Sequence, residues 1–263
     1  MNPDPVRFAL TLAGAQARTD ACRPAATVKV GLLLNPRARR LRARSTRSRL
    51  TGLFDSADVA QTRDLASLRR ALALLLCKSD VNVLAIAGGD GTVHHAVNAL
   101  MQLQDETEDA LGIRPPLPRL LLLNGGTLNI VSRTMRSRGS PRDTLKRFLR
   151  AFENARWSQV PTRRMPTMLV QCGSERPRHG FVFGSEVLYH SIELYMRFGA
   201  GYSGLSRFLA ELARGAVLGS DLWRAESWKL GPFGLPLTVD GRSYPDYAAV
   251  VASTVDLTLA VGR

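Results

Sequence analysis

The chain has 263 residues, and a hydrophobic content of 45% excludes disorder throughout the molecule. Its 36 Lys and Arg residues outnumber its 22 Asp and Glu residues, so a formal net charge of +14 points to an anionic partner. The three cysteines lie far apart without metal-type spacing, which argues against a disulfide framework or a zinc site and favours a reducing cytoplasm. No apolar run reaches the roughly 18 residues that span a bilayer, so any membrane contact is expected to be peripheral.

The N-terminal part of the chain is expected to begin with a poorly ordered leader, residues 1–27, followed by a strand over residues 28–34. Seven arginines lie between Arg37 and Arg49, and the pattern predicts one helix to about Phe54. On that helix Arg37, Arg40, Arg44 and Arg47 share a face. The face either attracts phospholipid headgroups, nucleotide phosphates or nucleic acid, or is an ordinary solvated surface. No aromatic residues interleave with these arginines, which argues against single-stranded nucleic acid.

Strands and helices are expected to alternate over the next hundred residues. Strands are predicted near residues 57–61, 81–87 and 119–123, and helices over residues 64–77, 92–101, 128–135 and 144–152. Residues 81–87 are nearly all apolar, as in a strand covered on both faces. The alternation predicts an α/β domain with a parallel sheet over residues 28–159.

The stretch Gly88-Gly89-Asp90-Gly91-Thr92 follows one of these buried strands and leads into a helix. Glycines let phosphate oxygens approach backbone N–H groups, and a helix start offers unpaired donors and a positive dipole end. A carboxylate beside a polyphosphate suggests that Asp90 holds a bridging magnesium ion or accepts a proton. The alternative is a tight strand-to-helix turn in which Asp90 is a capping residue.

A second glycine turn, Asn124-Gly125-Gly126-Thr127, follows the strand at residues 119–123 and again leads into a helix. Two strand ends that neighbour each other in the sheet would together grip one nucleotide. The adjacent His94 and His95 point in different directions on a helix and make a poor metal pair.

From about residue 160 the pattern changes to short β-like runs separated by Gly and Pro, which predicts a second, mainly β domain over residues 160–263. The runs are residues 168–172, 180–183, 226–230, 235–239 and 247–252. Two helices, residues 186–197 and 205–213, interrupt them; the apolar stripe of the second is either core or a lipid-facing surface. Gly199 to Gly204 matches a dinucleotide fingerprint, but a helical pattern precedes it where the fingerprint needs a strand.

The glycine turn at Gly88–Thr92, taken with Asn35-Pro36 upstream and Gly126-Thr127-Leu128-Asn129 downstream, resembles the diacylglycerol kinase catalytic-domain family, which includes bacterial lipid kinases and sphingosine kinases. The resemblance covers roughly residues 28–253. It implies a nucleotide domain like that of phosphofructokinases and NAD kinases, followed by a β-sandwich domain, with ATP and Mg²⁺ as cofactors. It also implies an ATP site lined by Asn35, Thr62, Gly88, Gly89, Asp90, Gly91, Thr92, Gly126, Thr127 and Asn129.

Three departures from the family pattern bear on activity. Ile130 stands where the family usually has Asp, and Arg242 replaces Glu in a Val-Asp-Gly-Glu type segment. The family's later acidic metal-binding stretch and its final Asp-Gly-Glu do not follow before Arg263. The sequence therefore predicts an incomplete sandwich domain, as in a truncated product, a shortened gene model or a divergent member with a reduced cap domain.

These observations predict an ATP-dependent lipid kinase that transfers the γ-phosphate to a lipid hydroxyl such as that of diacylglycerol, with Asp90 as its catalytic residue. It is expected in the cytoplasm, in peripheral contact with an anionic membrane. Two alternatives stay open: an inactive nucleotide-binding or membrane-binding relative, and a kinase of a soluble acceptor such as NAD.

Overall fold

The computed structural model describes residues 27–77, 81–199, 202–226 and 236–257, and the expected leader lies almost wholly outside them. The chain divides into two compact units, Met1–Phe181 with Val255–Arg263, and Val182–Thr254. Sequence analysis placed this boundary near residue 159. The difference arises because a hairpin at residues 168–180 packs on the first unit. No helix in the described part is both long enough and apolar enough to cross a membrane.

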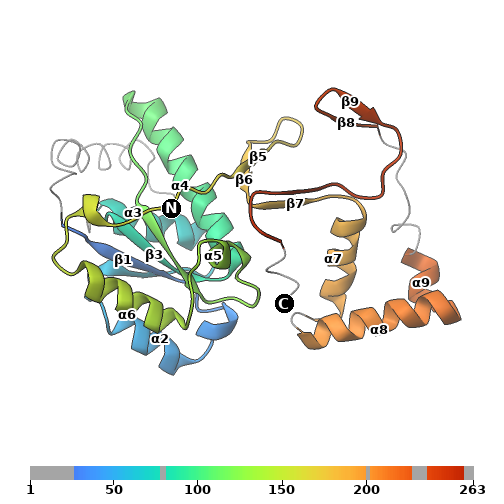
Figure 1. The fold of residues 1–263 in the computed structure, drawn as a ribbon, viewed down its shortest axis with the longest axis horizontal. Coiled ribbons are helices and arrows are strands. Elements are labelled where there is room, and N and C mark those ends of the chain that lie inside the picture. The colour runs from blue at the N-terminus through green and yellow to red at the C-terminus, as the bar shows by residue number, and fades with distance from the viewer. Residues whose placement is uncertain (1–26, 78–80, 200–201, 227–235, 258–263) are drawn as a thin grey trace. The chain divides into compact units, whose positions relative to one another are not determined.

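The first unit is built on a four-stranded sheet with the order β2-β1-β3-β4, in which all neighbours are parallel (Figure 1). Both central strands are buried along their whole length, as their unbroken apolar sequences predict. The strands are β1 (Val30–Leu34), β2 (Val59–Gln61), β3 (Val83–Gly88) and β4 (Arg119–Asn124). The structure thus confirms the expected parallel α/β core.

Helices cover both faces of this sheet. On one face, α3, α4 and α5 pack against side chains that include Leu84 and Ile86, and on the other α2 and α6 pack against Val83 and Ala85. Alternate residues of one strand therefore anchor opposite layers. The helices are α2 (Arg44–Thr51), α3 (Leu65–Cys77), α4 (Asp90–Leu111), α5 (Ile130–Thr134) and α6 (Pro141–Phe152).

The prediction of one arginine-rich helix from Arg37 to Phe54 is wrong. Arg37 lies in the turn after β1, a short 3₁₀ helix follows at Arg39–Leu41, and Ala43 is extended before α2 begins. The Arg47 guanidinium turns back to donate to the Leu41 carbonyl at 2.8 Å. Because the backbone breaks at Ala43, the four arginines do not share a helical face.

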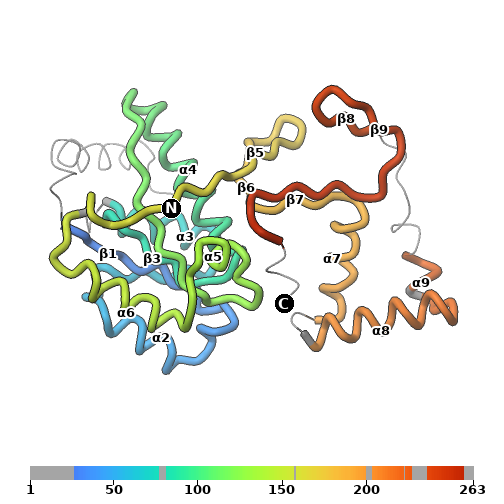
Figure 2. Tube along the Cα trace, in the orientation of Figure 1, coloured from blue at the N-terminus to red at the C-terminus, as the bar shows by residue number. Residues whose placement is uncertain are grey.

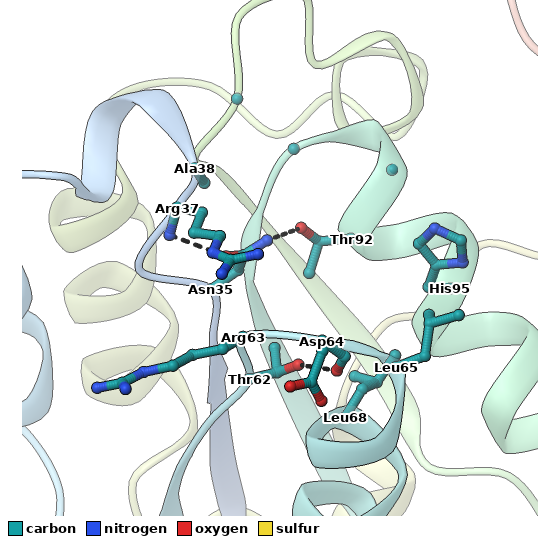
Figure 3. A pocket seen from close by; sticks show the side chains of 13 residues that line it. Asn35, Arg37, Ala38, Thr62, Arg63, Asp64, Leu65, Leu68, Thr92 and His95 are labelled. Carbon is teal, nitrogen blue, oxygen red and sulfur yellow. Dashed lines mark hydrogen bonds between the residues drawn. The ribbon is translucent and has the colours of Figure 1, made fainter.

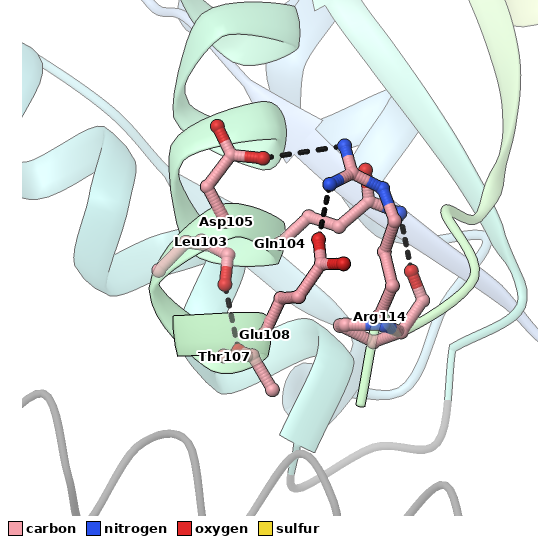
Figure 4. A network of polar contacts seen from close by, with 7 residues as sticks. Leu103, Gln104, Asp105, Thr107, Glu108 and Arg114 are labelled. Atoms are coloured by element: carbon pink, nitrogen blue, oxygen red, sulfur yellow. Dashed lines mark hydrogen bonds and ion pairs between the residues drawn. The ribbon is translucent and has the colours of Figure 1, made fainter. Parts of the chain in front are cut away.

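The C-terminal end of α4 is held by a polar network (Figure 4). The Arg114 guanidinium pairs with Asp105 at 3.2 Å and with Glu108, and Gln104 donates to the Pro115 carbonyl. The two acidic partners raise the pKa of Arg114, the Glu108 hydrogen bond contributing most. These contacts position the connection that leads from α4 into β4.

The two ends of the α/β core lie side by side. The Val28 amide donates to the Ala155 carbonyl at 3.0 Å, and Thr27 forms an isolated antiparallel bridge with Arg156. The Asn82 side chain donates to the Thr27 carbonyl at 2.8 Å and accepts from the Lys29 amide at 2.9 Å. The segment before β1 is thereby tied to the segment after α6.

A hairpin of β5 (Met168–Val170) and β6 (Arg178–Gly180) follows the α/β core. Asn98 of α4 clasps the backbone of His179: its Oδ1 accepts from the His179 amide at 2.8 Å, and its Nδ2 donates to the His179 carbonyl at 2.7 Å. The side chain amide therefore substitutes for a neighbouring strand. Sequence analysis expected one strand over residues 180–183, but buried Phe181 separates β6 from β7.

The second unit combines short antiparallel strands with helices, and Figure 2 shows its trace. β7 pairs with β10 and β8 with β9, as two separate pairs. The contact of α7 with α8 includes Phe208, whose ring lies 6.2 Å from that of Tyr195 and 5.9 Å from that of Phe198. The elements are β7 (Val182–Gly184), α7 (Val187–Arg197), α8 (Tyr202–Leu218), α9 (Asp221–Glu226), β8 (Leu237–Val239), β9 (Arg242–Tyr244) and β10 (Val251–Ser253).

Several expectations for this unit need adjustment. The expected helix over residues 205–213 is longer in both directions. The expected strand over residues 226–230 begins at Glu226, which ends α9, and its remainder lies outside the described residues. A helix does precede Gly199, as the argument against a dinucleotide fingerprint required.

Candidate functional site

The two glycine turns lie at the same edge of the sheet, because β3 and β4 are neighbours and Gly88 pairs with Asn124. A Cβ on Gly126 would come within 2.5 Å of the Gly89 Cα, and one on Gly125 within 2.8 Å of the Gly88 carbonyl oxygen. The turns therefore pack backbone against backbone, which only residues without side chains allow.

The first turn leaves the start of α4 uncapped. Gly89 is the N-cap residue and has no side chain to cap the helix, while its carbonyl accepts from the amides of Thr92 at 2.9 Å and Val93 at 3.1 Å. The first N–H groups of a helix lack partners within it and carry the positive end of its dipole. This helix start therefore offers donors to an anion.

Asp90, the first residue of α4, connects the two turns. Its Oδ1 accepts a hydrogen bond at 3.0 Å from the amide of Val131, in the first turn of α5. Asp90 thus caps α5, the helix after the second turn, rather than its own helix α4. The capping alternative therefore applies to α5, and the second carboxylate oxygen can still bind another partner. Its role toward magnesium or a proton stays a prediction.

Asn129 shapes the second turn from within. The residue has a positive φ of 53° and is 4% exposed. Its side chain accepts from the Gly126 amide at 2.7 Å and donates to the Gly126 carbonyl at 3.0 Å. Both halves of the amide group are engaged in holding the turn, so Asn129 acts on the site through Gly126.

A pocket of 420 Å³ opens in front of the two turns. Six of the predicted site residues line it: Asn35, Thr62, Gly89, Gly91, Thr92 and Gly126. The other four, Gly88, Asp90, Thr127 and Asn129, are not among the lining residues. Whether any of the ten contacts a nucleotide stays a prediction.

Asn35 joins two walls of this pocket (Figure 3). Its Nδ2 donates to the Thr92 hydroxyl at 2.9 Å, and its Oδ1 accepts from the Arg37 amide at 2.9 Å. The backbone N–H of Asn35 donates to the Ala87 carbonyl near the end of β3. The turn after β1 is thereby fixed to the glycine turn after β3.

The pocket has further lining residues outside the ten predicted ones: Arg37, Ala38, Arg63, Asp64, Leu65, Leu68 and His95. Of these, only Arg37 had been connected with nucleotide phosphates. Four of them follow β2 or begin α3, a segment for which only Thr62 was proposed. The signal that could have found them is Asp64-x-x-Ser67, which resembles a helix N-cap directly after a strand end. His95, which the sequence indicates is a poor metal ligand together with His94, is exposed and lines the pocket.

Two pKa shifts occur around the site. The pKa of Asp64 is lowered, chiefly because its carboxylate accepts a hydrogen bond from the Ser67 amide. Burial lowers the pKa of His94 on α4, and the positive charges of His95 and Arg178 lower it further. Asp64 is therefore an anion and His94 a neutral side chain near neutral pH. No group of three His, Cys, Asp or Glu suited to a metal occurs in the described ranges.

Comparison with known proteins identifies the family. Residues 29–158 match the diacylglycerol kinase catalytic domain. No curated protein matches the chain.

Solved structures from Bacillus anthracis strain Sterne are similar to 85–88% of the chain. One, of a proposed diacylglycerol kinase, has a TM-score of 0.51 at 18% identity over 88% of this chain and 68% of its own. A second, of a diacylglycerol kinase, has a TM-score of 0.47 at 17% identity and covers 86% of this chain and 63% of its own. A third, of a proposed diacylglycerol kinase, has a TM-score of 0.47 at 18% identity and covers 85% of this chain and 63% of its own. The chain thus spans less than two thirds of the length of the last two proteins. The first structure, with the TM-score of 0.51, supports the same fold for this chain. Residues 29–158, which contain the whole four-stranded sheet, thus match the diacylglycerol kinase catalytic-domain family.

Proposed function

We propose that this protein is an ATP-dependent lipid kinase that phosphorylates a lipid hydroxyl such as that of diacylglycerol. The observation that carries the proposal is the uncapped start of α4 beside two glycine turns in backbone contact, at the edge of a pocket. Backbone donors at such a helix start bind phosphate oxygens. Arg37 and Arg63 add positive charge to the pocket lining.

In this reaction the lipid hydroxyl oxygen forms a bond to the γ-phosphorus and releases its proton to water, the bond from that phosphorus to the β–γ bridging oxygen breaks, and ADP leaves. Catalysis of phosphoryl transfer is mostly positioning and neutralisation of charge. The N–H groups of the glycine turns would hold the phosphates, and the Asn35–Thr92 hydrogen bond would keep the β1 turn against them.

Asp90 is the residue proposed to hold Mg²⁺. One carboxylate oxygen is fixed by the Val131 amide, so the other has a defined direction. Magnesium is often bound by one or two carboxylates together with substrate phosphates, and a single Asp fits that pattern. When bound, the ion would neutralise phosphate charge.

The lipid acceptor implies contact with a membrane surface. Arg42, Arg44 and Arg49 of the segment from Arg37 to Arg49 are exposed. Exposed arginines attract anionic lipids, each contributing about 1 kcal/mol near the surface. We therefore infer peripheral binding to an anionic membrane from the cytoplasmic side.

The test compares the wild-type protein with Asp90→Asn and Asp90→Ala in ATP-dependent phosphorylation of diacylglycerol in anionic vesicles. Asparagine keeps an oxygen for the Val131 amide, so Asp90→Asn is expected to fold normally and to lose at least about 100-fold in turnover. Asp90→Ala also loses the cap, at about 1 kcal/mol of stability.

The outcomes separate the proposal from its rivals. ATP binding by all three proteins without transfer by any would identify a binding protein, which the departures at Ile130 and Arg242 favour. Transfer to NAD but not to diacylglycerol would identify a kinase of a soluble acceptor.

A further inference from the structure

Two helix starts line the same pocket, and they differ in chemistry. Gly89 and Gly91 belong to the start of α4, where no side chain caps the helix. Asp64 and Leu65 belong to the start of α3. Figure 3 shows the Asp64 and Thr92 side chains at the starts of these two helices.

The start of α3 is closed by its own residues. Asp64 Oδ1 accepts from the Ser67 amide at 2.7 Å, and the Ser67 hydroxyl oxygen accepts from the amides of Asp64 at 3.0 Å and Arg63 at 2.9 Å. This reciprocal capping uses backbone donors that an anion would otherwise bind. The start of α3 is therefore a poor place for a phosphate, although it lines the pocket.

The same contacts fix the Asp64 carboxylate. One oxygen is engaged by Ser67, and among the described residues the other, Oδ2, has no hydrogen-bond partner. Because its pKa is lowered, the carboxylate is ionised and can only accept hydrogen bonds. It would repel phosphate oxygens and attract a hydroxyl or amino group.

An apolar surface lies next to this carboxylate. Leu65 lines the pocket although it is 62% exposed, and Leu68, one turn further along α3, lines it from the core. Ala38 also lines the pocket. Aliphatic side chains beside one carboxylate suit the flat face of a nucleobase and the polar edge of its sugar.

From this contrast we infer the direction of the nucleotide: its phosphates lie at the uncapped start of α4, its nucleoside lies at Asp64 and Leu65, and Asp64 Oδ2 accepts a hydrogen bond from the nucleoside. The inference rests on the proposed function, since it assumes that the pocket takes a nucleoside triphosphate. The donor is either a ribose hydroxyl or the amino group of adenine, and both supply the N–H or O–H that the carboxylate requires. Asp64 is thus a specificity-determining residue.

The experiment measures binding calorimetrically in the absence of lipid, using the full chain. ATP, 2′-deoxy-ATP, 3′-deoxy-ATP and inosine triphosphate, which lacks the amino group of adenine, are titrated into wild type, Asp64→Asn and Asp64→Ser. Asn and Ser cap helices about as well as Asp, so both variants are expected to fold. Because the Asn oxygen must accept from Ser67, its NH₂ would face the nucleoside donor.

We expect the wild type to bind at least one analogue about tenfold more weakly than ATP, the range for a hydrogen bond to a charged group. Both variants should lose about tenfold for ATP and should no longer distinguish ATP from that analogue. Weaker binding of a deoxy analogue would identify a ribose hydroxyl as the donor. Weaker binding of inosine triphosphate would identify the amino group of adenine. Unchanged affinities for all four nucleotides in Asp64→Asn would overturn the inference.

Failure of the kinase proposal gives a different result. If the wild-type protein shows this binding pattern but phosphorylates no acceptor, the proposed kinase activity is wrong and the proposed role of Asp64 stands. If the protein is an active kinase and Asp64→Asn leaves every nucleotide affinity unchanged, only the proposed role of Asp64 is wrong.

Discussion

Gly89 and Gly126 lie in direct backbone contact, at the ends of neighbouring parallel strands. A methyl group on Gly126 would lie 2.5 Å from the Gly89 Cα, closer than real Cβ contacts. The adjacency of the two turns is thus built into the sheet register, and the shape of the pocket edge depends on both glycines.

Replacing Gly126 by alanine should therefore disturb the turn itself. Because the neighbouring atom is backbone and cannot rotate away, we expect a loss of about 1–3 kcal/mol in the free energy of unfolding, together with weaker ATP binding. Chemical denaturation and nucleotide titration measure the two effects.

The matched variant is Gly91→Ala, whose Cβ would meet nothing within 4 Å. Alanine in the first turn of α4 should leave stability unchanged or raise it by up to about 1 kcal/mol. If phosphates approach this backbone, the variant still binds ATP more weakly. Equal stability of the two variants would contradict the packing argument.

Asn98 is expected to hold the β5–β6 hairpin on α4. Asn98→Ala removes two hydrogen bonds to the His179 backbone, so the free energy of unfolding should fall by about 1–3 kcal/mol and the His179 amide should exchange faster. Urea denaturation and hydrogen exchange measure these changes.

Arg114→Ala is the control for this variant, because it breaks two exposed ion pairs and should alter stability by less than about 1 kcal/mol. A hairpin amide that exchanges at the same rate in Asn98→Ala and wild type would rule out the clasp.

His94 should make stability depend on pH. Its pKa is lower in the folded protein than in the unfolded chain, so below the ordinary value of 6.5 the unfolded chain binds more protons. The free energy of unfolding should therefore fall as the pH drops from 7.5 to 5.5. Glutamine cannot take up this proton, and His94→Gln should flatten the dependence.

Denaturant titrations at several pH values test this prediction. His95→Gln removes only the charge of His95, which lowers the pKa of His94 less than burial does, and should keep most of the slope. A slope that persists unchanged in His94→Gln would assign the effect to other groups.

Glu186 precedes α7 with φ of 49° and ψ of −114°, a backbone conformation that favours glycine. Its Oε2 is buried with no hydrogen-bond partner among the described residues. Glu186→Gly relieves both features and should raise the free energy of unfolding by about 1 kcal/mol.

Thermal unfolding checks this gain. Tyr247→Phe removes only the 3.4 Å hydrogen bond from the Tyr247 hydroxyl to Glu186 Oε1 and should bring no increase. A melting temperature below that of the wild type in Glu186→Gly would show that the strain argument is wrong.

The core of the fold could be predicted from sequence because its signals are local. The apolar runs at residues 28–34 and 81–87 identify strands covered on both faces, and the residues after them mark one edge of a parallel sheet. The two glycine turns were therefore expected to lie near one another, and the family resemblance added Asn35 and Thr62 to the same site. Residues of both turns line one pocket with Asn35 and Thr62.

Other features depend on contacts that no local pattern contains. The extended backbone at Ala43 breaks the arginine-rich helix, although its periodicity continues across the break. Sequence cannot distinguish an amide that faces a ligand from one that, like Asn129, hydrogen-bonds within its own turn. The cap formed by Asp64 and Ser67 is a local pattern, but the place of Asp64 in the pocket arises only when β2 lies beside β1, so Asp64 was missed.

The backbone bonds between Val28 and Ala155 and between Thr27 and Arg156 bring the entrance and the exit of the α/β core together. A segment whose two ends meet can be transplanted into a surface loop of an unrelated host, or given new termini by circular permutation, without stretching its sheet. The α/β half of this chain is in that sense a portable module.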